Sequence, residues 1–301
     1  MKKSICSLFL ALFLAFLTGN VCAQTGDNAV HKITVGNIEY TAKEKTDSKD
    51  EAVSHLLDAL AELIAPGKEL HGRYQNRTPH FGEMARHGIM AGLGKVRRLQ
   101  VYDGRIPEGQ MADGEKVYEI AGVLTDISPK MRTEPATGKD KDPKRSYRCV
   151  LTLNVRLLDY LTGQVLNTHT FSVAEYETSW QDTPGKALDA AMSKLSSSVA
   201  YYYNRMFPIS GTVIERGEVK KKKQKELYID LGSAVGAYAG LHFNIYSVKL
   251  IAGREAKTEV GRLRIEEVQG EDLSLCKVTH GGERVKDALD SGARLLVVSY
   301  E

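Results

Sequence analysis

The feature that most constrains the fold is a change of sequence pattern at Pro208. Before this proline, apolar residues recur in some segments with helical spacing and in others with strand spacing. After it, only short alternating segments remain, separated by turns that contain glycine. The pattern predicts an α+β chain of two domains. Residues 30–207 are expected to form an α/β sandwich, with helices packed on a mixed sheet, and residues 208–301 a small all-β barrel.

The first domain is expected to alternate strands and helices. Residues 31–40 predict a strand whose apolar phase slips by one residue at Gly36-Asn37, as at a β-bulge. Gly88 and Gly92 lie four residues apart and are expected to let their helix pack closely on the sheet. Further strands are predicted at residues 99–101, 116–127, 148–160 and 165–173, and helices at 48–64, from Thr78-Pro79 onward and at 183–206.

Three successive tyrosines, Tyr201, Tyr202 and Tyr203, lie near the end of the last of these helices. Because consecutive residues of a helix point in different directions, they cannot all face one core. At least one of them is expected at the surface or in an interface.

Six strands are predicted in the second domain, at residues 212–214, 227–231, 241–248, 262–268, 273–278 and 295–298. No helical period is recognised there. Lys220 to Lys223, together with Lys225, predict a solvated hairpin tip, and the alternative is that this run faces an anionic surface.

The N-terminus has the three parts of a cleavable signal peptide at residues 1–23: Lys2 and Lys3, an apolar run at 8–17, and small residues before the cleavage point at Ala23. The apolar run is shorter than the roughly 20 residues that span a bilayer. Cys22 follows Val21 rather than a small residue, which disfavours a lipoprotein. The mature chain is therefore expected to be soluble in the periplasm, with association to the outer membrane left open.

Removal of residues 1–23 takes away two lysines and no acidic residue, so the net charge falls from +3 to +1. A nucleic-acid-binding protein normally carries a clear positive excess, which neutralises phosphates, so nucleic acid is not an expected partner. Cys149 and Cys276 remain, too few for a disulfide scaffold. One belongs to the buried face of a strand and the other to the second domain, so two free thiols are expected and a bridge is the alternative.

Familiar catalytic signatures are missing from the sequence: a Gly-x-Ser-x-Gly elbow, a phosphate-binding glycine loop and a His-Glu-x-x-His zinc motif. We therefore predict no catalytic, cofactor-binding or metal-binding residue, and no enzyme. Three weaker candidates are present. His71, His80 and His87 are too widely spaced for a compact metal site. His169 is expected at the edge of the core, on one strand face with Val165 and Phe171. Glu266 and Glu267 are adjacent on a strand and are expected on opposite faces.

Three segments of the first domain carry a family resemblance: Gly-Val-Leu-Thr-Asp at residues 122–126, Leu-Leu-Asp-Tyr-Leu-Thr-Gly-Gln-Val at 157–165 and Ala-Leu-Asp-Ala at 187–190. With the order of elements around them, they resemble the periplasmic α/β domain of the curli secretion protein family CsgG. The same domain type occurs in the penicillin-binding-protein activator LpoB. The resemblance covers roughly residues 30–207.

The second domain is similar to the C-terminal β-domain of the flagellar T-ring protein FlgT. Its Asp-Leu-Gly-x-x-x-Gly-x-x-x-Gly pattern is found at Asp230, Leu231, Gly232, Gly236 and Gly240, where each glycine is expected at a turn of the chain.

One segment departs from the curli channel. Residues 128–148, where the channel inserts its pore hairpins, hold Pro129, Pro135, Pro143 and many charges in this chain, which disfavours the membrane-inserted strands of a pore. The resemblance therefore implies a soluble relative: a non-enzymatic, secretion-associated protein of envelope assembly that acts through contacts with other envelope proteins. An activator of a peptidoglycan synthase is the nearest alternative and a secreted hydrolase the third. Peripheral membrane association and a homo-oligomer are left open.

Overall fold

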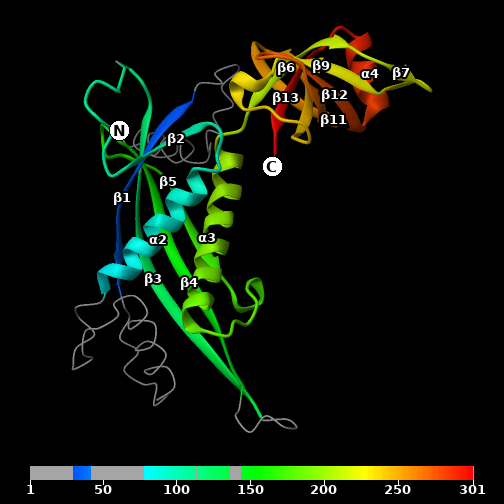
Figure 1. Ribbon diagram of the computed structural model, residues 1–301. Coiled ribbons are helices and arrows are strands. Elements are labelled where there is room, and N and C mark those ends of the chain that lie inside the picture. Colours follow the sequence, from blue (N-terminus) through cyan, green and yellow to red (C-terminus); the bar gives the residue numbers. More distant parts are fainter. Residues whose placement is uncertain (1–29, 42–77, 113, 136–143, 301) are drawn as a thin grey trace, which may run out of the picture.

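The computed structural model describes residues 30–41, 78–112, 114–135 and 144–300. They form an elongated α/β unit with a β-barrel across one of its ends (Figure 1). Each unit has its own hydrophobic core, and Phe207 belongs to the first core whereas Ile209 belongs to the second. The helix predicted at residues 48–64, and His71, lie outside the described residues.

The α/β unit is a five-stranded mixed sheet with two helices on one face, as the sequence predicts (Figure 1). The strand order is β2-β1-β3-β4-β5. Strand β1 runs parallel to its neighbours β2 and β3, whereas β3, β4 and β5 form an antiparallel meander around the sheet's central strand, β3. The strands are β1 (His31–Tyr40), β2 (Leu99–Asp103), β3 (Val117–Glu134), β4 (Lys144–Asp159) and β5 (Val165–Val173).

Local chemistry accounts for the bends of the sheet. The register between β1 and β3 shifts between Val35 and Ile38, which confirms the predicted bulge. The turn from β4 to β5 is held by Asp159, whose Oδ1 accepts hydrogen bonds from the backbone N–H groups of Leu161 and Thr162 at 3.1 and 2.8 Å. Gly163 follows with φ at 67°, a conformation that favours glycine.

The two helices are α2 (Thr78–Leu93) and α3 (Pro184–Met206). Thr183 caps α3 by accepting a hydrogen bond from the backbone N–H of Lys186 at 3.3 Å. Gly88 and Gly92 were predicted to let their helix pack closely on the sheet. This was wrong, because both glycines face α3. A Cβ atom at Gly92 would lie 2.6 Å from the carbonyl oxygen of Ser196. Gly82 is the glycine of α2 that meets the sheet, where a Cβ would lie 2.2 Å from the carbonyl oxygen of Ile38.

The three tyrosines of α3 point in three directions. Tyr203 is fully buried, Tyr202 is half-buried against β5, and Tyr201 is exposed. The exposure of Tyr201 confirms that at least one of them lies at the surface.

The segment expected to lack pore strands contains a long paired extension that the sequence did not predict. Beyond the end of the helices, β3 and β4 continue together as a two-stranded arm (Figure 1), with the pairs running from Pro129 opposite Cys149 to Glu134 opposite Lys144. Pro129 is tolerated because β3 pairs with β1 only as far as Leu124. Past that point no described strand pairs with this edge of β3, and a residue without an N–H can occupy such an unpaired edge. We call residues 128–134 and 144–148 the hairpin arm.

The second unit is a closed barrel in the order β10-β11-β12-β9-β6-β13, which confirms the predicted small barrel. Its strands are β6 (Ser210–Arg216), β9 (Glu226–Ile229), β10 (His242–Ile251), β11 (Arg254–Val268), β12 (Ser274–His280) and β13 (Arg294–Ser299). The predicted lysine-rich tip is a short hairpin of β7 (Val219–Lys220) and β8 (Lys223–Gln224).

One element contradicts the all-β prediction. Residues Gly282–Asp290 form a helix, α4, which connects β12 to β13. The side chain of Val285 is fully buried in the barrel core, so α4 covers one end of the barrel.

The two units meet at the opposite end of the barrel through arginine side chains. Arg97 donates a hydrogen bond to the carbonyl oxygen of Gly236 at 2.8 Å and lies 4.1 Å from the centre of the Tyr238 ring. Arg98 donates to the carbonyl oxygen of Pro208 at 2.7 Å. Within the described residues, no helix is long and apolar enough to cross a membrane.

Candidate functional site

The histidines singled out in the sequence are not brought together. His87 is exposed on α2, and His169 lies on β5. His71, and the side chain of His80, lie outside the described residues. In the part of the chain that the structure describes, no three His, Cys, Asp or Glu side chains are close enough to share a metal ion.

His169 is a packing residue at the edge of the core, as predicted. Its ring stacks on that of Tyr202, with 3.8 Å between the ring centres, and meets the edge of Phe171. Burial lowers the pKa of His169, which favours the neutral ring. Val165 does not share this face: the register shifts between the pairs of Leu157 and Leu158, and Val165 is exposed.

The remaining polar candidates have no arrangement suited to catalysis. Cys149 and Cys276 are unbridged and buried, which confirms the predicted free thiols. Burial raises the pKa of each thiol to about 12, so neither is a ready nucleophile.

Glu266 and Glu267 were expected on opposite faces. A bulge in β11 between Ile265 and Glu267 instead leaves both side chains exposed.

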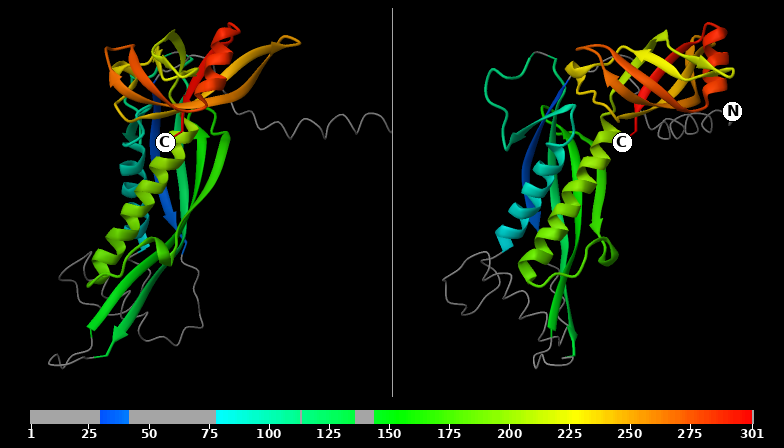
Figure 2. Two further views of the ribbon diagram at one scale, coloured as in Figure 1. Left: turned by 90° about the vertical axis from the view of Figure 1, so that its right-hand side faces the viewer. Right: turned by 45° about the vertical axis from the view of Figure 1, so that its right-hand side comes forward.

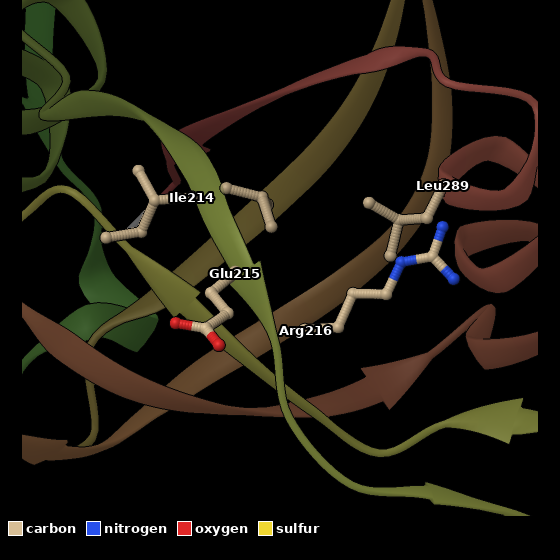
Figure 3. Close-up of a pocket in the computed structure, with 5 residues that line it drawn as sticks. Ile214, Glu215, Arg216 and Leu289 are labelled. Atoms are coloured by element: carbon tan, nitrogen blue, oxygen red, sulfur yellow. The ribbon is translucent and has the colours of Figure 1, made fainter.

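Both units have a hollow on the surface of their described residues. One lies on the barrel and is lined by Val213, Ile214, Glu215, Arg216 and Leu289 (Figure 3). Figure 3 shows Glu215 and Arg216 pointing to opposite sides of β6, and Arg216 is already paired with Asp290 at 2.6 Å. These charges do not converge on a common point.

The second hollow is a groove between α2 and α3. Its walls carry methionine, alanine and serine side chains, and Lys95 donates a hydrogen bond to Ser196 across one end at 3.2 Å. The close approach of the helices at Gly88 and Gly92 makes this groove shallow. His87 and Asp189 also line the groove, and within the described residues neither is hydrogen-bonded to a serine of its walls.

The most distinctive surface lies where the hairpin arm leaves the sheet. The ring of Trp180 has two guanidinium groups near it, that of Arg132 at 4.8 Å and that of Arg148 at 4.6 Å from the ring centre. The segment after β5 is held against the arm by two backbone hydrogen bonds of 2.7 Å between Tyr147 and Gln181. We call Arg132, Arg148 and Trp180 the Trp180 cluster.

The electrostatic character of this surface is positive. The hairpin arm carries Lys130, Arg132, Lys144, Arg145 and Arg148 against a single acidic residue, Glu134. Guanidinium groups are attracted to the face of an indole ring, so the cluster holds its arginines in place. Arg132 also pairs with Glu134 at 3.1 Å, and both of these side chains are about half exposed. Arginine and tryptophan are the residue types enriched where proteins bind one another tightly.

None of the residues of this site was predicted from the sequence. The one sequence feature that points to it is Trp180, the single tryptophan of the chain. The contact of Trp180 with Arg132 and Arg148 depends on the extension of β3 and β4, which was not predicted because of the prolines in that segment.

Comparisons with known proteins add only a distant likeness. No family model matches the chain, and no curated protein matches it. Among solved structures, a PelC dodecamer from Paraburkholderia phytofirmans is 15% identical, with 56% of this chain and 88% of that chain covered at a TM-score of 0.27. A Xanthomonas campestris protein of the DUF330 family is 13% identical, with 58% and 83% covered at a TM-score of 0.31. These likenesses are too distant to assign a function.

Proposed function

We propose that this chain is a non-enzymatic periplasmic protein of cell-envelope assembly, and that it binds another envelope protein through the hairpin arm. The observation that carries the proposal is the Trp180 cluster, in which Arg132 and Arg148 of the projecting arm lie over the half-buried ring of Trp180. The signal sequence at residues 1–23 supports the location. The resemblances to CsgG, LpoB and FlgT support the class of function.

Charge indicates what kind of partner fits. The arm bears five basic residues and one acidic residue, so an acidic protein surface would complement it. A partner that covers the cluster would remove water from the two guanidinium groups and strengthen their hydrogen bonds to carboxylates. The cationic surface is expected to speed association, and binding should weaken as salt is added.

The test is site-directed photocrosslinking in intact cells that make the protein. A photoreactive residue replaces Met131, which is exposed on the arm, and in the control chain it replaces Leu161, which is exposed at the opposite end of the sheet. We expect a discrete adduct with an envelope protein from position 131 and none from position 161. Arg132→Glu should remove most of the adduct, whereas Arg205→Glu, a matched reversal on the far end of α3, should leave it.

The identity of the adduct separates the alternatives. A component of a secretion system or surface organelle supports the leading proposal, whereas a cell-wall synthase supports the activator of peptidoglycan synthesis. Equal adducts from both positions, or an adduct indifferent to Arg132→Glu in a chain that melts like the parent, would remove the hairpin arm as the binding site.

A further inference from the structure

Two hairpins project from the barrel at the end that α4 covers, away from the α/β unit. Strand β6 starts at the junction, ends at Arg216 and continues into the β7–β8 hairpin. Strand β10 likewise ends at this side with Ile251 and turns back into β11 at Arg254. Figure 2 shows α4 and the hairpins at the end of the barrel that lies farthest from α3. We call residues 219–225 and 248–257 the distal hairpins.

The β10–β11 hairpin ends in exposed aliphatic side chains. Leu250 is 75% exposed and Ile251 is 63% exposed. Strand β10 pairs with β13 only as far as Val248, opposite Arg294, so no further strand covers the tip. Consecutive residues of a strand point to opposite faces, so this tip is apolar on both of its sides. Two large exposed aliphatic side chains at the end of a hairpin indicate a surface that becomes buried on binding.

Charge is distributed very unevenly over the barrel. The distal hairpins carry eight basic residues and one acidic residue, whereas the other residues of 208–301 carry seven basic and thirteen acidic residues. The basic residues of the distal hairpins are Lys220, Lys221, Lys222, Lys223, Lys225, Lys249, Arg254 and Lys257. The near-neutral total for this domain therefore hides a strongly cationic end.

The lysine side chains of the β7–β8 hairpin are exposed from Lys220 to Lys223. Lys221 and Lys222 form its turn with φ at 52° and 63°, a conformation that asparagine and glycine adopt more easily than lysine. Among the described ion pairs of this hairpin, Lys223 pairs with Glu283 on α4 at 3.3 Å. No ion pair within the described residues engages Lys220, Lys221 or Lys222, so their charge is available to a ligand.

We propose that the distal hairpins dock the protein on an anionic lipid bilayer. Leu250 and Ile251 enter the apolar side of the interface, and the surrounding lysine and arginine side chains contact the phosphate groups. An apolar insertion and a basic patch are the two signals whose combination gives stable peripheral binding, since either one alone is weak. The basic residues are spread over two separate hairpins, and such a spread suits the broad anionic surface of a bilayer.

This inference does not rest on the function proposed for the hairpin arm. The arm extends from the other end of the α/β unit, so a barrel held at a membrane would leave it free to reach a second protein (Figure 1). Failure of either experiment leaves the other proposal standing.

Vesicle binding tests the proposal with the chain from Gln24 onward, the form expected after export. We expect co-sedimentation with vesicles of equal parts phosphatidylcholine and phosphatidylglycerol, and little with phosphatidylcholine alone. Leu250→Ser with Ile251→Ser should weaken binding at least tenfold. The matched control is Leu161→Ser with Leu166→Ser, two exposed leucines of the α/β unit, and it should bind like the parent.

Charge is tested separately at the lysine turn. Lys221→Asn with Lys222→Asn removes two charges but keeps residues suited to a positive φ, so the hairpin is retained. Binding to the anionic vesicles should fall several-fold and should become less sensitive to salt.

Insertion is tested by a fluorescent label. An environment-sensitive dye on Ala252→Cys lies at the hairpin turn, and it labels selectively because Cys149 and Cys276 are buried. Its emission should shift to the blue with anionic vesicles only. Binding that ignores lipid charge, serine variants that bind like the parent, or an unshifted dye would overturn the proposal. Concentration-dependent dimerisation that the serine variant abolishes, without vesicle binding, would assign the surface to a second copy instead.

Discussion

At the scale of single residues, burial decides what the polar side chains can do. Cys149 and Cys276 lie on interior faces of β4 and β12, where the thiolate loses its hydration. Burial therefore raises the pKa of both thiols to about 12. A thiol of that pKa is roughly one part in ten thousand thiolate at about pH 8, and the thiolate is the reactive form.

The prediction is that native protein resists alkylation at both cysteines. Iodoacetamide at about pH 8 should leave the mass of the folded chain unchanged over a period that fully modifies the same chain in denaturant. The exposed thiol of Ala252→Cys provides the internal positive control. Rapid modification of native Cys149 or Cys276, read by peptide mass mapping, would contradict the burial that the fold assigns to them.

The sequence predicted which side chains are buried better than it predicted which side chains contact one another. The free thiols and the exposed tyrosine follow from periodicity, because a helix or strand period determines which side chains face the core. The Trp180 cluster could not be predicted in this way. It joins Trp180 to Arg132 and Arg148, which are 32 or more residues away in the chain, across strands whose register the sequence does not reveal.

At the scale of elements, the crossing of α2 and α3 depends on glycine. A methyl group at Gly92 would lie 2.6 Å from the carbonyl oxygen of Ser196 and 2.8 Å from Cβ of Val199, closer than such atoms can approach. The same group at Gly88 would meet Leu195 Cδ2 at 3.5 Å, an ordinary contact. The two positions share a helix and differ in the space beside them.

Alanine substitutions should therefore have opposite effects. Gly88→Ala should stabilise the protein by up to about 1 kcal/mol, because alanine favours a helix over glycine. Gly92→Ala gains the same helix preference but must push the helices apart, with a net cost of about 1–3 kcal/mol. Urea unfolding followed by circular dichroism measures both. Equal shifts of the two midpoints would mean that the helices do not cross at Gly92.

Elements with a long, regular period were predicted well, and those without one were not. Strand β5 has the predicted bounds, and β1 has the predicted bulge. Helix α4 was missed because nine residues provide only two turns, with Val285 as the single buried side chain. The hairpin arm was not predicted because its proline and its many charges interrupt the apolar alternation by which a strand is recognised.

At the scale of the whole molecule, the two cores are separate and the chain passes between them at Pro208. Contacts at the junction include those of Arg97 with Gly236 and Tyr238, and of Arg98 with Pro208. Polar contacts of this kind each contribute about 0.5–1.5 kcal/mol. The barrel is closed on itself and filled by its own apolar side chains, so its stability should come mainly from within.

Residues 208–301 are therefore expected to fold alone and to melt cooperatively, with a midpoint close to that of the barrel in the full chain. Circular dichroism of the fragment and of the chain from Gln24 onward makes the comparison. An unfolded or aggregated fragment would show that the α/β unit is needed to complete the barrel. A folded fragment allows the two proposed surfaces to be separated: the barrel alone should bind anionic vesicles as the full chain does, and, lacking the hairpin arm, it should form none of the arm's protein adducts.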